Sequence, residues 1–138
     1  MIGLAAALVN RLSTSDVLQR KLAVYERVPA IFTATRIPEN CGYPYVWTPG
    51  EYSSVDDAVK NARLSEIHRD VSVYTLDEGS DALVEELAWA IRNVLHKAPL
   101  RLGADENVVL NAAPPIVAPT GDGVLGRLVQ LRFVISEG

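Results

Sequence analysis

Three side chains in the sequence could act as nucleophiles or carry protons. Cys41 is the single cysteine, and His68 and His96 are the only histidines. A serine or cysteine nucleophile needs a histidine to accept its proton, so a hydrolytic site would have to use one of these two. Cys41 lies between Asn40 and Gly42, without a basic neighbour that would stabilise a thiolate. We therefore expect no catalytic residue, and we expect Cys41→Ser to leave function intact.

Both histidines have a structural explanation. His68 falls on the polar side of a predicted strand, where it would be solvated or make a cross-strand contact. His96 falls in the last turn of a predicted helix, where a partly charged imidazole complements the helix dipole. Neither has motif partners at the spacing that a catalytic site requires.

The stretch Gly121–Gly126 matches the nominal dinucleotide-binding pattern G-x-G-x-x-G. That motif works by placing a pyrophosphate at the start of a helix, and it needs an acidic residue about 20 positions later. Here an alternating apolar pattern, typical of a strand, follows the glycines up to Ile135. We expect the segment Thr120–Gly123 to form a hairpin turn, and we expect no cofactor.

Acidic residues gather around the start of a predicted helix. Their spacing does not follow that of a calcium-binding loop, and acids near a helix N-terminus are already stabilised by the helix dipole. A single cysteine also excludes zinc sites built from two or more cysteines. We therefore expect no bound metal and interpret the cluster as a solvated helix face: Asp77, Glu78, Asp81, Glu85 and Glu86.

Length, charge and hydropathy limit the class of protein. The 138 residues correspond to one domain, 1–138, and the 49% apolar and 22% charged residues are typical of a folded soluble chain. The net charge of -4 has the wrong sign for coating nucleic acid phosphates. The apolar run Met1–Val9 is shorter than the roughly 20 residues of a membrane span, and Arg11 follows it where a signal peptide has its charge in front. We expect an unprocessed soluble protein, with the cytosol favoured.

Apolar spacing predicts three helices. Leu4, Leu8 and Leu12 recur every fourth residue, as on one face of a helix. The segment Ser13–Asp16 offers N-cap oxygens for a second, short helix. The longest helical stripe runs from Leu83 to about His96, with acids early and bases late.

Strands are predicted between and after these helices. We expect strands or extended edges at Val24–Val28, Tyr43–Trp47, Leu64–Thr75 and Asn107–Asn111, with a last strand through Val129 and Ile135. The stretch from Pro29 to Gly42 is expected to be irregular. This order favours an α+β fold: an antiparallel sheet of about four strands, with helices packed on one face.

The segment Thr48–Arg63 is predicted to be a long polar loop. Loops longer than about 12 to 15 residues are uncommon in compact domains and often functional, although a mobile surface loop is the alternative. Aromatic residues of the preceding strand are also typical of interfaces. The candidate partner-contact residues are therefore Glu51, Tyr52, Asp56, Asp57, Lys60, Arg63, Tyr45 and Trp47.

A series of loose motifs resembles a family of small phage proteins over almost the whole chain, from Leu4 to Ile135. The family is that of the tail-completion proteins of long-tailed phages and gene transfer agents, also called tail terminators or tail-to-head joining proteins. The similar segments are, in order, Val24–Tyr25, Tyr43–Val46, His68–Tyr74, Ala98–Leu100, Gly121–Gly123 and Leu131–Phe133. The sequence departs from the family in the long Thr48–Arg63 connection and in the insert Asn107–Pro119.

The resemblance implies a ring-forming subunit without a catalytic role. It implies a homo-oligomer, typically a hexamer, that sits in the virion at the head-proximal end of the tail tube. There it would stop tube polymerisation and present a surface to a head-completion or neck protein, after synthesis in the bacterial host cytoplasm. DNA would only pass through the lumen, and the acidic balance suits such passage.

The sequence leaves two other functions open. A neck or head-completion connector would form a ring on the portal side instead, and electron microscopy would separate it from a tail terminator. A small α+β enzyme or ligand-binding domain would need a deep pocket at Cys41, His68 or His96. Loss of function on substitution of one of these residues would favour the enzyme.

Overall fold

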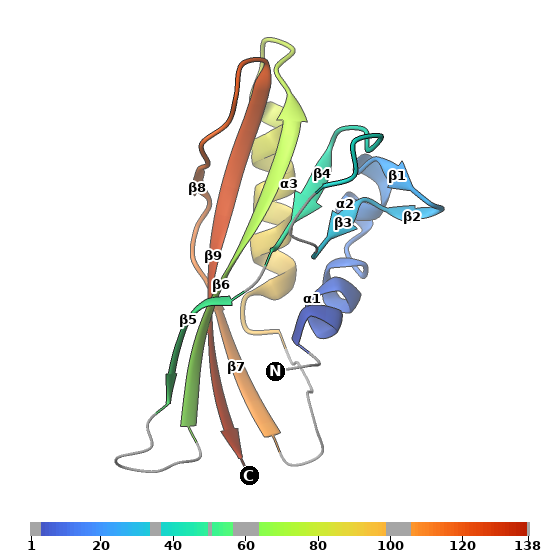
Figure 1. Ribbon diagram of the computed structural model, residues 1–138. Coiled ribbons are helices and arrows are strands. Elements are labelled where there is room, and N and C mark those ends of the chain that lie inside the picture. Colours follow the sequence, from blue (N-terminus) through green and yellow to red (C-terminus); the bar gives the residue numbers. More distant parts are fainter. Residues whose placement is uncertain (1–3, 34–36, 50, 57–63, 99–105, 138) are drawn as a thin grey trace.

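The fold is described from a computed structural model. It describes residues 4–33, 37–49, 51–56, 64–98 and 106–137. Its elements follow the order helix, helix, short strands, long strand, helix, strands (Figure 1).

The three predicted helices are confirmed. Helix α1 spans Leu4–Leu12, α2 spans Asp16–Lys21 and α3 spans Ala82–Leu95. Ser15 caps α2, because its hydroxyl accepts a hydrogen bond from the Leu18 backbone nitrogen at 3.4 Å. The buried positions of α3 recur at helical spacing and form its contact with the rest of the core: Val84, Leu87, Ala88, Ile91 and Leu95.

Two long strands form the centre of the sheet. Strand β6, Leu64–Leu76, pairs antiparallel with β9, Val124–Glu137, from Leu64 opposite Ser136 to Leu76 opposite Val124. Strands β4, Tyr45–Trp47, and β5, Glu51–Asp56, both pair with β6 along its other side. Strands β7, Glu106–Ala112, and β8, Ile116–Val117, both pair with the free side of β9. The hairpin predicted at Thr120–Gly123 therefore joins β8 to β9, as expected.

Among the described residues the main sheet has seven strands, so the expected number of about four was too low. Each flank of the β6–β9 pair is built from two successive strands, because the flanking chain leaves the ladder between β4 and β5 and again between β7 and β8. One further strand, β3 at Ile31–Phe32, lies parallel to β4 within the stretch expected to be irregular. The sheet is thus mainly antiparallel with one parallel pair.

Three of the expectations for the first half of the chain are wrong. Thr48–Arg63 is not a loop throughout, since Glu51–Asp56 forms β5; a strand at the side of a sheet is held by backbone hydrogen bonds and needs no apolar stripe. Val24–Val28 is not one strand but a tight hairpin of β1, Val24–Tyr25, and β2, Val28–Pro29. Tyr43–Trp47 is not an edge strand, because β3 covers the side of β4 that faces away from β6.

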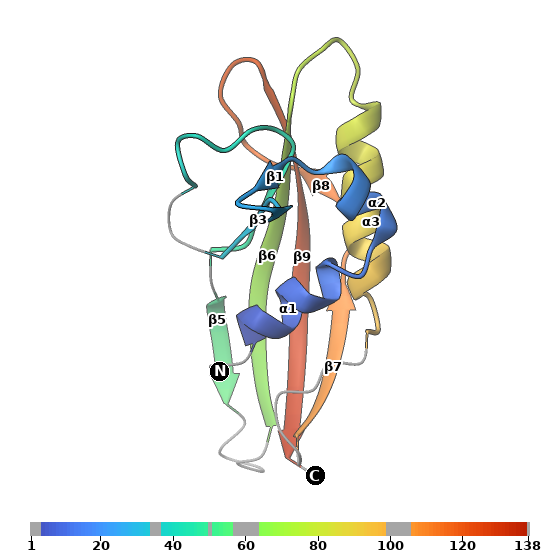
Figure 2. The same ribbon diagram turned by 90° about the vertical axis from the view of Figure 1, so that its right-hand side faces the viewer.

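The helices all cover the same face of the sheet (Figures 1 and 2). The core lies between them, where one side of each long strand meets α3, α1 and α2. The largest fully buried side chains are Phe133, Leu8, Leu12, Leu18, Leu87, Ile91, Leu95, Leu110, Leu131, Val46 and Val71. The other face of the sheet carries no helix in the described part of the chain, and we call it the open face.

The alternation predicted for the apolar residues of β6 is confirmed, but Ser72, expected on the wet face, is only 6% exposed. Ile67, Val71 and Val73 are buried on the helix-covered face. Arg69 shares their parity and is only 3% exposed. Among the described residues, no helix is long and apolar enough to cross a membrane.

Candidate interaction surfaces

The three side chains that could do chemistry lie in different places. Cys41 precedes β4, and its thiol donates a hydrogen bond to the Gly42 carbonyl oxygen at 3.2 Å. Burial raises the pKa of the Cys41 thiol, so it stays protonated and is a poor nucleophile. His68 lies on the open face of the sheet, whereas His96 ends α3 on the covered face. The structure does not bring these groups together into one site.

His68 borders a shallow hollow on the open face. The hollow has a volume of about 380 Å³ and is lined by side chains of β6, β9 and β7. Four of its seven lining residues have polar side chains, and the neighbouring Asp70 has one carboxylate oxygen that is buried without a hydrogen-bond partner in the described part of the chain. The lining residues are His68, Asn111, Ala112, Ala113, Gln130, Leu131 and Arg132.

His96 joins the end of α3 to β7. Its Nδ1 accepts a hydrogen bond from the Ala112 backbone nitrogen at 3.0 Å, and Arg92 Nε donates to the Ala112 carbonyl oxygen at 3.2 Å. The Lys97 backbone nitrogen donates to the Leu110 carbonyl oxygen at 2.8 Å. These contacts occupy backbone groups of β7 that do not face β9, so they protect this part of the strand against pairing with another chain.

The His96 contact predicts a pH dependence of stability. Partial burial, Arg92 and Lys97 hold the pKa of His96 below its ordinary value of 6.5. The imidazole of His96 binds a proton more readily in the unfolded chain than in the folded one. The contribution of His96 to the free energy of unfolding should therefore be constant above pH 6.5 and decrease as the pH falls from 6.5 towards the lower pKa of the folded state. Urea unfolding at several pH values measures the effect.

A matched variant separates His96 from the other titrating groups. In His96→Asn the amide oxygen can take the place of Nδ1 as acceptor but cannot be protonated. We expect the variant to lose less stability than the wild type over the same acid range. Identical pH profiles for the two proteins would contradict the role of His96.

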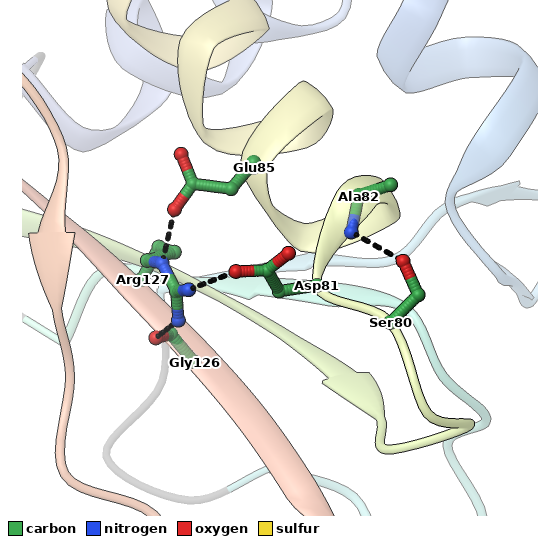
Figure 3. Close-up of polar contacts among 6 residues, drawn as sticks. All are labelled: Ser80, Asp81, Ala82, Glu85, Gly126 and Arg127. Carbon is green, nitrogen blue, oxygen red and sulfur yellow. Dashed lines mark hydrogen bonds and ion pairs between the residues drawn. The ribbon is translucent and has the colours of Figure 1, made fainter.

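The acidic cluster at the start of α3 binds basic side chains instead of standing free in solvent (Figure 3). Arg127 of β9 donates to Glu85 through Nε and to Asp81 through Nη2, the latter at 3.3 Å. Glu86 pairs with Lys21 at the end of α2. The solvated helix face predicted from the sequence is thus partly wrong, because three of the acids tie α3 to β9 and to α2.

The glycine motif is a turn followed by a packing site. Gly123 has a φ of 80°, the left-handed conformation that a tight turn requires, and β9 begins at the next residue. Gly126 lies opposite Tyr74 in the sheet. A Cβ atom at Gly126 would lie 2.7 Å from Thr120 Cγ2 and 3.0 Å from two atoms of the Tyr74 ring. The motif therefore serves the fold, as the sequence predicted.

The predicted partner-contact residues are only partly placed by the structure. Tyr45 and Trp47 are half-buried in β4. Glu51, Tyr52 and Asp56 belong to β5, where the backbone is described. Asp57, Lys60 and Arg63 lie outside the described residues.

Tyr45 lies at the centre of a row of aromatic rings. Its ring centroid is 5.3 Å from those of Tyr43 and Tyr74 and 6.3 Å from that of Phe32, which in turn lies 5.4 Å from Tyr25. Burial, followed by the neighbouring Tyr43, Tyr74 and Cys41, raises the pKa of Tyr45 to about 12. The row links the β1–β2 hairpin to the main sheet, so most of this aromatic surface is already used within the subunit.

Comparisons with known proteins identify the chain. The family model described as tail completion protein gp17 matches residues 6–136. The chain belongs to the tail completion protein gp17 family. Members of this family are structural proteins of phage-type tails, so the chain is a virion component, as the resemblance implied. No curated protein matches the chain significantly.

A solved structure shares the fold of this tail completion family member. A chain in the structure titled "Virion of native gene transfer agent (GTA) particle" superposes with a TM-score of 0.70 at 23% sequence identity. The match covers 98% of this chain and 95% of that chain. At this identity the likeness establishes the fold.

Where exposure is described, the large exposed apolar side chains of this family member form three groups and one further residue. Val24 and Val28 lie on the β1–β2 hairpin, and Trp89 on α3 lies on the side of β8, which carries Ile116 and Val117. A third group borders a hollow of about 350 Å³ beside the start of α3: Tyr43, Leu76 and Leu83. Val109 lies on the open face, apart from these groups. Sequence patterns missed the first two groups; the one signal was that Trp89 falls outside the apolar stripe of α3.

Proposed function

We propose that this chain is the subunit of a closed ring, a hexamer, at the head-proximal end of the tail tube. The ring ends polymerisation of the tube and provides the surface to which the head attaches. The whole of residues 1–138 acts as one tail-terminator domain, with no catalytic step. Its partners are other copies of itself, the tail tube protein and a head-completion or neck protein.

One observation carries the ring. Exposed apolar side chains lie at both lateral edges of the sheet. Val24 and Val28 of the β1–β2 hairpin lie beside β3 and β4, and Ile116 and Val117 of β8 lie beside β9 (Figure 1). Isolated exposed apolar residues are ordinary, but groups of them mark interaction sites. Two different patches on opposite sides suit head-to-tail contacts between identical subunits, and such contacts close into a ring when the rotation permits.

The predicted contact residues suit an axial partner. The long strands extend past the helices at the end of the sheet that contains β5 and the start of β6 (Figure 1). Contacts to the tube or neck are assigned to this end, through Glu51, Tyr52, Asp56, Asp57, Lys60 and Arg63. Tyr45 and Trp47 lie further along the same flank of β6 and extend this surface.

The experiment compares virions that contain or lack this chain. Without it we expect tubes of uncontrolled length that carry no heads, and electron microscopy of the labelled protein should place it between tube and head. Replacing Asp57–Arg63 by a short Gly-Ser turn should give the same defect, since β5 and β6 are kept while the contact residues Asp57, Lys60 and Arg63 are lost. Cys41→Ser is the control, with normal virions expected.

Two results would contradict the proposal. Tails of normal length with heads attached in the absence of the chain would exclude a terminating role. Density for the label on the portal side of the neck would identify a head-completion connector instead.

A further inference from the structure

One row of α3 faces the β7–β8 side of the sheet. Glu85, Trp89, Arg92 and His96 follow each other at intervals of four, three and four residues, the spacing of one helix face. Three of the four contact that side, since Glu85 binds Arg127 whereas Arg92 and His96 bind the backbone of Ala112. Trp89 lies between these anchors and is 43% exposed. A large aromatic side chain is thus held at this edge without being covered.

Strand β8 extends the apolar surface beside Trp89. Val117 lies opposite Arg127, the partner of Glu85, and is 71% exposed. Ile116, opposite Leu128, is 47% exposed, but its side chain alternates with that of Val117 and lies on the open face. We call Trp89 and Val117 the edge patch. A fixed tryptophan beside an aliphatic side chain has the composition of a binding hot spot.

The β1–β2 hairpin projects from the other side of the molecule (Figure 1). Val24 is 69% exposed and Val28 58%. Between the strands, Glu26 and Arg27 have φ angles of 50° and 73°, a left-handed conformation that favours glycine or asparagine. Val24 pairs with Pro29 and Val28 with Tyr25, so the two valines lie on opposite faces of the hairpin. We call Glu26, Arg27 and Val28 the hairpin patch. Residues held in an unfavourable backbone conformation are common at functional sites.

The charges of the two patches complement each other. Before Trp89 on α3, Asp81 and Glu85 share the single cation of Arg127, which leaves one negative charge in excess. After Trp89 comes Arg92. The hairpin carries one charge of each sign, and in the described part of the chain neither Glu26 nor Arg27 forms an ion pair. Arg27 can therefore meet the excess carboxylate while Glu26 meets Arg92.

We propose that the hairpin patch of one copy binds the edge patch of the next copy. Val28 packs against Trp89 and Val117, and the two pairs of opposite charges set the direction of the contact. The two patches lie at opposite lateral edges of the sheet. Each copy therefore binds one neighbour through its hairpin patch and the other neighbour through its edge patch. This contact rests on the proposed ring and specifies the residues that close it.

Variants of each patch test the contact in sedimentation experiments on the full chain, with tail tube protein present. Trp89→Ala in the edge patch and Val28→Asp in the hairpin patch should each lower the association constant by more than about 30-fold, the effect of losing a hot spot. Both side chains are exposed, so circular dichroism should show an unchanged fold. Val109→Asp is the matched control, because Val109 is 49% exposed on the open face and belongs to neither patch.

Mixing the two variants gives a sharper result. The Trp89→Ala chain retains its hairpin patch, and the Val28→Asp chain retains its edge patch. Each should be monomeric alone, and an equimolar mixture should form dimers that grow no further. A symmetric contact, in which the same patch meets itself, would leave one of the two variants able to pair with itself, so that variant would already be dimeric alone.

The outcomes separate this contact from the ring itself. If rings persist in both variants, the assigned contact is wrong and the proposed function stands. The same conclusion follows if Val109→Asp abolishes the rings as strongly as the two variants do. A wild-type chain that is monomeric with and without tube protein overturns both.

Discussion

Arg69→Ala is expected to lower the free energy of unfolding by about 3 to 5 kcal/mol, because it removes a buried charged donor and leaves polar partners without hydrogen bonds. Arg69 is 3% exposed and Thr48 is fully buried. Arg69 Nε donates to the Thr48 hydroxyl at 2.6 Å, and Nη2 donates to the Thr48 carbonyl oxygen at 2.8 Å. Alanine would leave both oxygens unsatisfied and a cavity beside the core.

The position of Thr48 explains why this arginine is needed. Thr48 follows β4, at the point where the flanking chain leaves the ladder before β5, and its backbone nitrogen donates to Phe32 of β3 at 2.9 Å. Strand pairing is interrupted here, so a side chain must bind the backbone oxygen that the ladder leaves open. Arg69 therefore fixes the corner where β3, β4 and β6 meet.

Two substitutions calibrate the Arg69 measurement. Arg132→Ala removes the same side chain from an exposed position on β9, where we expect a loss of less than about 1 kcal/mol. Arg69→Lys keeps the charge but not the forked donor geometry, and its stability should fall between those of the wild type and Arg69→Ala. Equal losses for the Arg69 and Arg132 alanine variants in urea unfolding would rule out this role.

Gly126→Ala is expected to lower the free energy of unfolding by about 1 to 3 kcal/mol, as overpacking does in a filled site. The added methyl group would overlap Thr120 Cγ2 at 2.7 Å and press on the Tyr74 ring at 3.0 Å. Gly121→Ala is the control within the same motif, because a Cβ there meets nothing within 4 Å. That control should stay within about 0.5 kcal/mol of the wild type, as surface substitutions usually do.

A second substitution tests whether Thr120 causes the loss. Thr120→Ser removes Cγ2 but keeps the hydroxyl, which donates to the Val124 carbonyl oxygen at 2.6 Å. The double variant should recover part of the stability lost in Gly126→Ala, since the closest overlap is gone. Strict additivity of the two substitutions in thermal unfolding would contradict this account of the glycine.

The sequence by itself determined the elements whose periodic pattern is long. Leucine spacing predicted α1 and α3, and alternation predicted β6 and β9, because a helix or strand with one buried face repeats apolar residues at its own period. The glycines at 121 and 123 predicted the turn before β9, since a tight turn needs the conformations that glycine adopts readily. These local rules were enough for the α+β class and for helices on one face.

Only the tertiary structure decided the features that depend on neighbours from distant parts of the chain. Glu26 and Arg27 carry no turn signal, and their hairpin is attached to the sheet through the contact of Tyr25 with Phe32. Strand β5 has no apolar period, because its partner β6 supplies the backbone hydrogen bonds. The edge patch likewise exists only because Arg127 and Ala112 hold the Trp89 row of α3 beside β8. Each of these features rests on contacts between residues far apart in sequence, and such contacts leave no local pattern to read.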